Sequence, residues 1–439
     1  MFFFLLVIIL ILTKASYAQY LETVIPVGSF PRAFGYNSTN YKVYCANSGD
    51  NTVTIINTQN NQVITTIRVG TYPCAFAYNS ASNKIYCANQ QSNEVSIING
   101  ATNEVINTVT VGLRPTSLLF NSTNNKVYCA NSSGNSVSVI GGGNDNVVAT
   151  INVGGFPTCL TLNSTNNKIY SANTDGNTVT IIDCVTDQVI STVPVGISPS
   201  SIAYDPDNNE IYCSSWANGR IHMINGSTNQ LVDSIIYGNA GPQSLIKYSF
   251  YNRIFYANFT GDNIKVIDGG SDSVIGTSQF LVGERPYTII PTYAGIYCAN
   301  LGSNSIVVID PFYGNFIIRI NVGYPVALIS SSIRVYVANL FSSNVSVIRQ
   351  NLIGLEENNT RIDSEEIFKI YPNPTKSYFT IRSPQITNNA SLKLFDITGK
   401  LIKEVKVTRP EMLIPLNGIK PGIYFIEVGT IRKKLIVST

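Results

Sequence analysis

The chain has 439 residues, of which 44% are hydrophobic and 13% are charged, with a formal net charge of +3 and a single histidine. Abundant β-branched and aromatic residues at low net charge exclude intrinsic disorder, and a charge of +3 over this length excludes a nucleic-acid-binding protein. At roughly 100–200 residues per domain, the length suggests more than one folded unit.

The first residues carry a targeting pattern. Residues 2–12 form an apolar run that is shorter than the roughly 20 residues of a membrane-spanning helix. Small residues at 15–18 follow and place a cleavage site before Gln19. We expect a signal peptide over residues 1–18, with a short membrane anchor as the alternative. No later segment is long and apolar enough to span a membrane, so we expect no transmembrane segment in the mature chain.

An internal repeat dominates residues 21–349. Its strongest marker is an aromatic residue in a strand-like pentapeptide such as Val43–Asn47, and successive copies are 39 to 43 residues apart. This aromatic residue is found at Tyr44, Tyr86, Tyr128, Tyr170, Tyr212, Phe255, Tyr297 and Tyr336. A second marker is a proline after a glycine-containing turn, found at Pro31, Pro73, Pro115, Pro157, Pro199, Pro242, Pro286 and Pro325.

Each repeat contains four short β-branched or aromatic runs separated by Asn, Gly, Ser or Pro. Four strands in about 42 residues, with no helical period, are typical of a propeller blade. The third run, such as Val53–Ile56, is apolar on both faces, as expected where blades pack face to face. Residues 21–28 match the fourth run, which the last repeat lacks. We therefore predict an all-β, eight-bladed β-propeller over residues 19–350, closed by the N-terminal strand, with seven blades as the alternative.

These strands resemble a known family. The tyrosine pentapeptide, the following Asn-Thr-Val-Thr-Ile-Ile and the closing Val-Gly-x-x-Pro are similar to the YVTN family of β-propeller repeats, known from surface-layer and other exported proteins. The resemblance covers residues 21–349 and implies the fold. It does not imply one activity, because related propellers include binding scaffolds, lactonases and lyases.

The composition changes after Arg349. Residues 351–368 carry a net charge of −4, which indicates an acidic linker. Residues 369–439 carry a net charge of +8 and contain runs in which apolar and polar residues alternate, as in β-strands. The alternation predicts a small immunoglobulin-like β-sandwich. This segment resembles the type A sorting domain of the type IX secretion system. The resemblance rests on motifs that include Pro372, Asn373, Pro374, Gly399, Lys400, Gly422, Tyr424, Lys433 and Lys434.

The sorting resemblance implies a route and a partner. The chain would pass through the periplasm, engage the type IX secretion machinery through its tail, and be released or attached at the outer-membrane surface. The linker has a polar composition, so we expect it to be accessible to proteases. Processing of such tails is expected there.

Candidates for catalysis are few. His222 occupies a third-strand position where other repeats have Thr or Ser, so we read it as structural; a Ser-His-Asp triad would rest on it alone. Asp205 and Asp207 lie in a turn and could be calcium ligands, but turn formation explains them better. We therefore expect no catalytic residues, no metal site and no cofactor.

Eight cysteines are expected to act mainly as small apolar residues. Five of them occupy one repeat position, and equivalent positions in adjacent blades should lie about 10 Å apart, too far for a disulfide. A bond between Cys74 and Cys87 within one hairpin remains open, because their register is uncertain by one residue.

The remaining candidates are surface residues. The turn before each repeat proline and the turn after each tyrosine strand should emerge on one face, which collects Phe30, Arg32, Tyr72, Arg114, Phe156, Trp216, Phe259, Arg285, Tyr287, Tyr324 and Phe341. Aromatic residues and Arg are enriched at binding hot spots, although such rings can also simply fill gaps between blades. We expect a non-enzymatic binding module for a protein or glycan; the alternative is an exported lactonase- or lyase-like enzyme.

The linker generates a first prediction. We expect the mature secreted protein to be cut between Asn351 and Phe368, because a polar segment without packing is open to proteases. Peptide mapping of the protein recovered from the culture medium or cell surface checks this. Recovery of Tyr371 to Thr439 still joined to the rest of the chain would contradict it.

Overall fold

The computed structural model describes residues 19–236, 241–275, 280–292, 294–311, 316–350, 369–371, 377–382, 390–396, 400–407, 411–428 and 431–437. Residues 18–350 form one compact unit, and the described part of 369–437 belongs to a second. The predicted signal peptide and acidic linker lie outside the described residues. Within those residues, no helix is long and apolar enough to cross a membrane.

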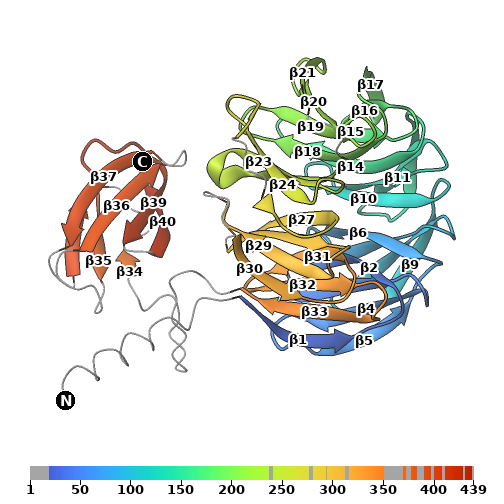
Figure 1. The fold of residues 1–439 in the computed structure, drawn as a ribbon, viewed down its shortest axis with the longest axis horizontal. Coiled ribbons are helices and arrows are strands. Elements are labelled where there is room, and N and C mark those ends of the chain that lie inside the picture. The colour runs from blue at the N-terminus through green and yellow to red at the C-terminus, as the bar shows by residue number, and fades with distance from the viewer. Residues whose placement is uncertain are drawn as a thin grey trace. The chain divides into compact units, whose positions relative to one another are not determined.

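In its described residues, the first unit consists of eight antiparallel sheets (Figure 1). In each sheet the strands lie side by side in the order first, second, third and fourth. The first strands are β2 (Pro31–Asn37), β6 (Pro73–Asn79), β10 (Pro115–Asn121), β14 (Pro157–Asn163), β18 (Pro199–Asp205), β22 (Pro242–Tyr248), β27 (Pro286–Thr292) and β31 (Pro325–Ser331). The second strands are β3 (Lys42–Asn47), β7 (Lys84–Asn89), β11 (Lys126–Asn131), β15 (Lys168–Asn173), β19 (Glu210–Ser215), β23 (Arg253–Asn258), β28 (Gly295–Asn300) and β32 (Arg334–Asn339).

The third and fourth strands complete each sheet. The third strands are β4 (Thr52–Asn57), β8 (Glu94–Asn99), β12 (Ser136–Gly141), β16 (Thr178–Asp183), β20 (Arg220–Asn225), β24 (Asn263–Asp268), β29 (Ser305–Ile309) and β33 (Asn344–Arg349). The fourth strands are β5 (Val63–Arg68), β9 (Val105–Thr110), β13 (Val147–Asn152), β17 (Gln188–Pro194), β21 (Leu231–Ile236), β25 (Ser273–Val274), β30 (Phe316–Asn321) and β1 (Tyr20–Pro26). In Figure 1 the first strands lie toward the middle of the unit and fourth strands such as β5, β9 and β21 toward its outside.

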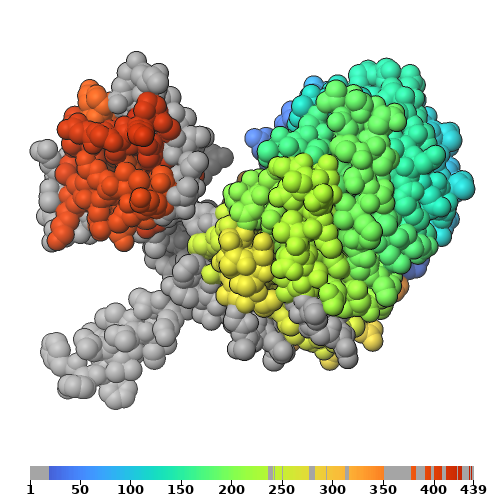
Figure 2. Space-filling model, turned by 90° about the horizontal axis from the view of Figure 1, so that it is seen from above, coloured from blue at the N-terminus to red at the C-terminus, as the bar shows by residue number. Residues whose placement is uncertain are grey.

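The sheets pack face to face through their second and third strands. In β4, Val53, Ile55 and Ile56 are fully buried, so both faces of this strand are covered, as its apolar pattern predicts. One core cluster joins Tyr44 and Ile55 of the first repeat to Ile85 of the next, so the core lies between sheets. Figure 2 shows the cyan, green and yellow surfaces of successive sheets adjoining one another. This burial accounts for the low charge content.

In six of the eight sheets, a buried tyrosine of the second strand forms a hydrogen bond with the next sheet within the described residues. The Tyr86 hydroxyl donates to Asp145 Oδ1 at 2.7 Å, and the Tyr128 hydroxyl donates to Asp187 Oδ1 at 2.9 Å. The acceptors lie in the turn between the third and fourth strands of the following sheet. The same contact is made by the pairs Tyr44–Asn103, Tyr170–Asn229, Tyr212–Asp272 and Tyr336–Asn61. We call this the tyrosine–turn contact.

The acceptor residue of each tyrosine–turn contact has a left-handed backbone. The φ angles of Asn61, Asn103, Asp145, Asp187, Asn229 and Asp272 lie between 51° and 66°. Asn and Asp tolerate this region better than other non-glycine residues. The turn chemistry of the repeat therefore also provides the acceptor for the neighbouring sheet.

The N-terminal strand lies in a sheet with the last three strands of the unit. β1 pairs antiparallel with β33, with Tyr20 opposite Arg349 and Pro26 opposite Asn344. The sheet order is β1-β33-β32-β31. In addition, β2 contacts both β6 and β31. The chain ends of the unit are thus hydrogen-bonded to each other.

One sheet departs from the regular pattern. In the sheet of β22, β23 and β24, the outer edge is formed by two short strands, β25 (Ser273–Val274) and β26 (Phe280–Leu281), which both pair with β24. A 3₁₀ turn, η1 (Ser249–Tyr251), follows β22. This sheet is the least regular of the unit in its described residues.

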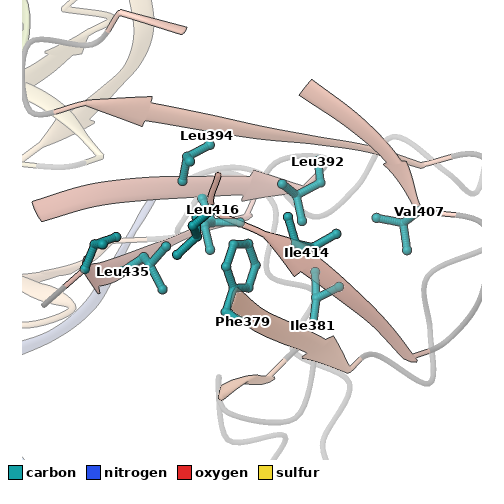
Figure 3. Packing of buried hydrophobic residues seen from close by; sticks show 10 residues of the cluster. Phe379, Ile381, Leu392, Leu394, Val407, Ile414, Leu416 and Leu435 are labelled. Atoms are coloured by element: carbon teal, nitrogen blue, oxygen red, sulfur yellow. The ribbon is translucent and has the colours of Figure 1, made fainter. Parts of the chain in front are cut away.

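The second unit contains two antiparallel sheets. One has the order β34 (Lys369–Tyr371), β35 (Tyr378–Arg382) and β38 (Glu411–Pro415). The other has the order β37 (Leu401–Val407), β36 (Ala390–Asp396), β39 (Gly422–Val428) and β40 (Ile431–Val437). Figure 3 shows their shared core, in which Phe379 and Ile381 lie close to Leu392 and Ile414. These strands fit the strand-like alternation of residues 369–439.

An ion pair fixes β1 to the last sheet. The Arg334 guanidinium donates two hydrogen bonds to the Glu22 carboxylate, each 2.7 Å long. These hydrogen bonds hold the pKa of Glu22 below its ordinary value, although burial acts in the opposite direction. A carboxyl group with a lower pKa in the folded state stabilises the fold above the unfolded-state pKa. That contribution is lost as the pH falls through the folded-state pKa.

We therefore expect Glu22→Gln to lower the free energy of unfolding at neutral pH by about 1.5–3 kcal/mol, the range for hydrogen bonds to charged groups. The difference from the wild type should disappear in acid, below the folded-state pKa of Glu22. Denaturant unfolding across this pH range measures both effects. Glu104→Gln, at an exposed carboxylate, is the control. A loss of equal size at neutral and acid pH would contradict the ion-pair explanation.

Candidate functional site

Two turns of every repeat are hydrogen-bonded together and form one face of the first unit, which we call the loop face. The amide of the residue after the second strand donates to the carbonyl of the residue before the repeat proline. Examples are Ser48 to Phe30 at 3.1 Å and Gln90 to Tyr72 at 2.9 Å. The same bond joins Ser132 to Arg114, Thr174 to Phe156, Trp216 to Ser198, Phe259 to Gly241, Leu301 to Arg285 and Leu340 to Tyr324.

Several candidate residues on the loop face have unusual backbones. Phe30, Tyr72, Arg114, Phe156 and Arg285 have φ angles between 51° and 61°. Bulky residues rarely adopt this left-handed region, which costs on the order of 1–3 kcal/mol when occupied by a non-glycine residue. The amide-to-carbonyl bond of the two turns holds them there.

Five residues of the loop face lie together. Phe30 meets Phe341 edge to face with ring centroids 6.1 Å apart, and Phe341 meets Tyr324 at 4.8 Å. Arg32, two residues after Phe30, lies over the Tyr72 ring, 4.6 Å from its centroid. We call Phe30, Arg32, Tyr72, Tyr324 and Phe341 the aromatic arc. It extends over the sheets of β31, β2 and β6.

The aromatic arc is only partly covered by the protein. Phe30 is 46% exposed and Phe341 is 66% exposed, whereas the rings of Tyr72 and Tyr324 are half-buried. Exposed rings held by neighbouring rings present a rigid apolar surface. The interpretation that these residues only fill gaps between sheets does not account for Phe341.

The other predicted binding residues are separate from the arc. Arg114, Trp216 and Arg285 are exposed, and Phe156 and Tyr287 are half-buried. No ring or cation contact joins these five to the arc within the described residues. Arg114 lines a hollow of about 520 Å³ with Gln90, Gln91, Asn93, Leu113 and Ser133. A second hollow of about 280 Å³ is lined by Asp262, Gly283, Glu284, Ser303 and Arg319.

The opposite face of the unit is an amide network. Asn37 Nδ2 donates to Asn83 Oδ1 at 2.8 Å, and the same spacing joins Asn79 to Asn125. Lys84 and Lys126 reach Asp145 and Asp187 of the following sheets. These side chains are occupied with one another, which favours the loop face as the place for a partner.

His222 is buried and neutral. It lies in β20 opposite Cys213 and is 6% exposed. Burial, with a smaller effect of Arg220, lowers the pKa of the imidazole. Neither ring nitrogen has a hydrogen-bond partner within the described residues. A Ser-His-Asp triad needs a hydroxyl and a carboxylate bonded to this ring, and the described residues provide neither bond.

Asp205 and Asp207 belong to an ion pair and a turn. Lys247 Nζ lies 2.5 Å from Asp205 Oδ1 and 3.1 Å from Asp207 Oδ2. Asp205 Oδ1 also accepts from the Asp207 amide at 2.9 Å, which closes the turn. The described residues contain no group of three or more His, Cys, Asp or Glu side chains placed to hold a metal ion.

All eight cysteines are free thiols. Cys74 and Cys87, the pair left open by the sequence, are not joined, because Phe76 and not Cys74 lies opposite Cys87. Burial raises the pKa of the Cys74 thiol to about 11 and those of Cys45 and Cys87 further. The repeated cysteines are packed like small apolar residues.

The sorting motifs are partly described. Tyr424 donates to the Lys420 carbonyl at 2.8 Å, and the Lys400 amide donates to Asp396 Oδ1 at 3.0 Å. Gly422 begins β39, and Lys433 and Lys434 lie in β40. Pro372, Asn373, Pro374 and Gly399 lie outside the described residues.

The fold and the loop face define an all-β repeat protein of the propeller class with a separate C-terminal β-domain. Residues 10–200 match the YNCE-like beta-propeller family, and residues 369–438 match the secretion system C-terminal sorting domain. The chain therefore carries a YNCE-like β-propeller and a type IX sorting domain at its C-terminus. The sorting domain supports export by the type IX system.

The chain is also similar to one curated protein and to solved structures, and the solved structures agree with the fold. Beta-agarase A of Zobellia galactanivorans is 25% identical over 195 residues, 44% of this chain, and the chain spans about a third of that protein. Among solved structures, the computationally designed Ika8 protein has a TM-score of 0.63 at 15% identity, covering 76% of this chain and all of that chain. Saccharomyces cerevisiae Sqt1 has a TM-score of 0.66 at 12% identity, with the same coverages. Kuenenia stuttgartiensis hydrazine synthase has a TM-score of 0.52 at 16% identity, covering 64% and 97%.

Sequence reasoning named His222 but did not group it with Ser215 and Asn218. Ser215, Asn218 and His222 lie at the loop end of β19 and β20 with buried polar atoms that have no partner within the described residues. The available signal was a departure from the repeat, because Ser214-Ser215 stands where most repeats have Ala-Asn.

The Lys247 ion pair provides a stability prediction. Asp205 and the Lys247 side chain are both buried, so Asp205→Asn leaves a buried ammonium without its main partner and should cost about 3–5 kcal/mol. Asp207→Asn is the control; Asp207 is 46% exposed and should cost less than about 1 kcal/mol. The double variant D205N/K247Y, which restores the residues of regular repeats, should recover most of the loss. Calcium should not raise the unfolding midpoint of the wild type; a clear rise would contradict the turn assignment.

Proposed function

We propose that this protein is an exported, non-enzymatic binding module whose propeller holds a protein or glycan partner on the loop face. The sorting domain supports delivery by the type IX secretion system. We further propose that a signal peptide at residues 1–18 directs the chain through the periplasm. The mature protein is then released or held at the outer-membrane surface. Residues 351–368 act as the linker before a sorting domain with an immunoglobulin-like sandwich.

We propose eight blades closed by the N-terminal strand. The pairing of β1 with β33 and the bond from Tyr336 to Asn61 at 2.9 Å support this arrangement. The second of these is the tyrosine–turn contact made between the last repeat and the first. Seven blades would leave one four-stranded sheet without a place.

The aromatic arc is the observation that carries the binding proposal. It combines exposed Phe rings with an Arg stacked on Tyr72, the residue types that dominate binding energy in interfaces. Its residues come from three sheets whose relative positions are fixed by buried contacts. A partner therefore meets a surface that loses little conformational entropy on binding.

An enzyme is the second candidate, favoured by the similarity to a β-agarase over part of its length. Catalysis by general acids and bases needs titratable groups that converge on a substrate. The first strands contribute mostly Ala, Ser, Thr, Leu and Ile near the middle of the unit. The binding role is the better supported of the two.

A screen of the full chain against glycans and surface proteins tests the proposal. Tyr72→Gly and Phe30→Gly should weaken partner binding by at least about tenfold, which corresponds to 1.4 kcal/mol. Both positions have positive φ, so glycine should leave the unfolding midpoint unchanged or raise it. Tyr41→Gly, on the opposite face at a φ of 53°, is the matched control and should bind like the wild type.

Two outcomes would overturn the proposal. Undiminished binding by both arc variants would move the site away from the arc. Turnover of a lactone or polysaccharide by the wild type, with no stable complex, would favour the enzyme instead.

A further inference from the structure

The sheet of β18 to β21 lacks a buried polar pair that five other sheets have. In the preceding sheet, Asn173 Nδ2 donates to the hydroxyls of Thr178 at 3.0 Å and Thr180 at 2.9 Å. In the sheet of β18 to β21, Ser215 takes the place of that Asn and His222 takes the place of Thr180. The replaced side chains do not restore the bonds.

Four polar atoms are left without partners at this point. Ser215 Oγ, Asn218 Oδ1 and both ring nitrogens of His222 are buried and have no hydrogen-bond partner within the described residues. Two of these side chains, Asn218 and His222, lie against Gly196, where a Cβ atom would be 2.5 Å from Asn218 Nδ2 and 2.6 Å from His222 Nε2. A buried polar atom without a partner costs about 1–3 kcal/mol, so this group gains most from a ligand that supplies hydrogen bonds.

Trp216 stands beside these atoms. It follows Ser215 directly and is 43% exposed on the loop face. Its amide donates to the Ser198 carbonyl at 2.9 Å, and its indole lies against Gly241, where a Cβ would be 2.4 Å from Nε1. Trp216 therefore offers a fixed, partly open aromatic face one residue along the chain from the unpaired hydroxyl of Ser215.

We propose that Trp216, Asn218, Ser215 and His222 form a binding subsite for a neutral saccharide. A sugar ring has an apolar face that fits an indole, and each of its hydroxyls both donates and accepts hydrogen bonds. The inference rests on the proposed binding function and adds a ligand class and a place, distinct from the aromatic arc.

Other ligand classes fit less well. A neutral imidazole has one donor and one acceptor, which suits a hydroxyl but not a carboxylate or phosphate, and Arg220 is engaged with Ser234 at 3.0 Å. A metal ion needs more ligands than one histidine supplies, and the described residues hold no metal-binding group. A neutral, hydroxyl-rich ligand is the remaining match.

The chain provides its own reporter for the test. Trp216 is the single tryptophan, so the intrinsic tryptophan fluorescence of the full chain comes from this subsite alone. We expect a saturable change in emission on titration with neutral mono- and oligosaccharides of glucose, galactose, mannose and N-acetylglucosamine. A panel with no saturable change would overturn the proposal, and the buried polar atoms would then be bridged by water only.

A variant that restores the residues of the regular repeat gives a sharper test. S215N/H222T rebuilds the Asn–Thr pair of the preceding sheet and should keep or raise the unfolding midpoint while weakening the saccharide response at least tenfold. Wild-type affinity in this variant would also overturn the proposal. Tyr41→Gly, on the opposite face, is the control and should keep the full saccharide response. Loss of partner binding in Tyr72→Gly, together with no saccharide response in the wild type, would support the proposed function and overturn this subsite.

Discussion

The tyrosine–turn contact is the interaction on which the rest of the first unit depends. Six buried tyrosine hydroxyls each bond to a left-handed Asn or Asp in the following sheet, so these contacts fix the position of one sheet on the next. A net contribution of about 0.5–1.5 kcal/mol for a neutral bond, and about 1.5–3 for a bond to Asp, accumulates over the unit. The acceptor residues could not be replaced freely, because the same residue must also shape its own turn.

This fixed stacking decides where function can lie. Amide side chains of the opposite face are tied to their neighbours, whereas residues before the repeat prolines vary without disturbing the packing. The loop face can therefore carry different chemistry on different sheets. The aromatic arc gathers on the sheets of β31, β2 and β6, and the polar group around Trp216 lies on the sheet of β18 to β21. Two kinds of surface thus share one scaffold.

Much of the fold could be predicted because the same strand pattern occurs eight times in the sequence. Strand positions and the doubly buried third strand followed from spacing and alternation, and the sorting domain followed from the resemblance of its motifs to a known family. The contacts within the arc could not be predicted, because Phe30 and Phe341 are more than three hundred residues apart and meet only where the first and last sheets of the unit lie side by side. The Lys247–Asp205 pair was missed for a related reason: its partners lie in different sheets, and Lys247 stands where most repeats have an apolar or aromatic residue.

The pairing of β1 with β33 also sets the order in which the chain becomes complete. β1 is made first and its partner almost last, so this strand waits for nearly the whole unit before its backbone is paired. Such a distant pairing is slow to form because loop closure must precede any gain from contacts. During synthesis and export β1 is thus an unprotected edge whose Tyr20, Leu21 and Val24 stay exposed even in the finished sheet. The chain must be kept from aggregating until its last repeat has emerged.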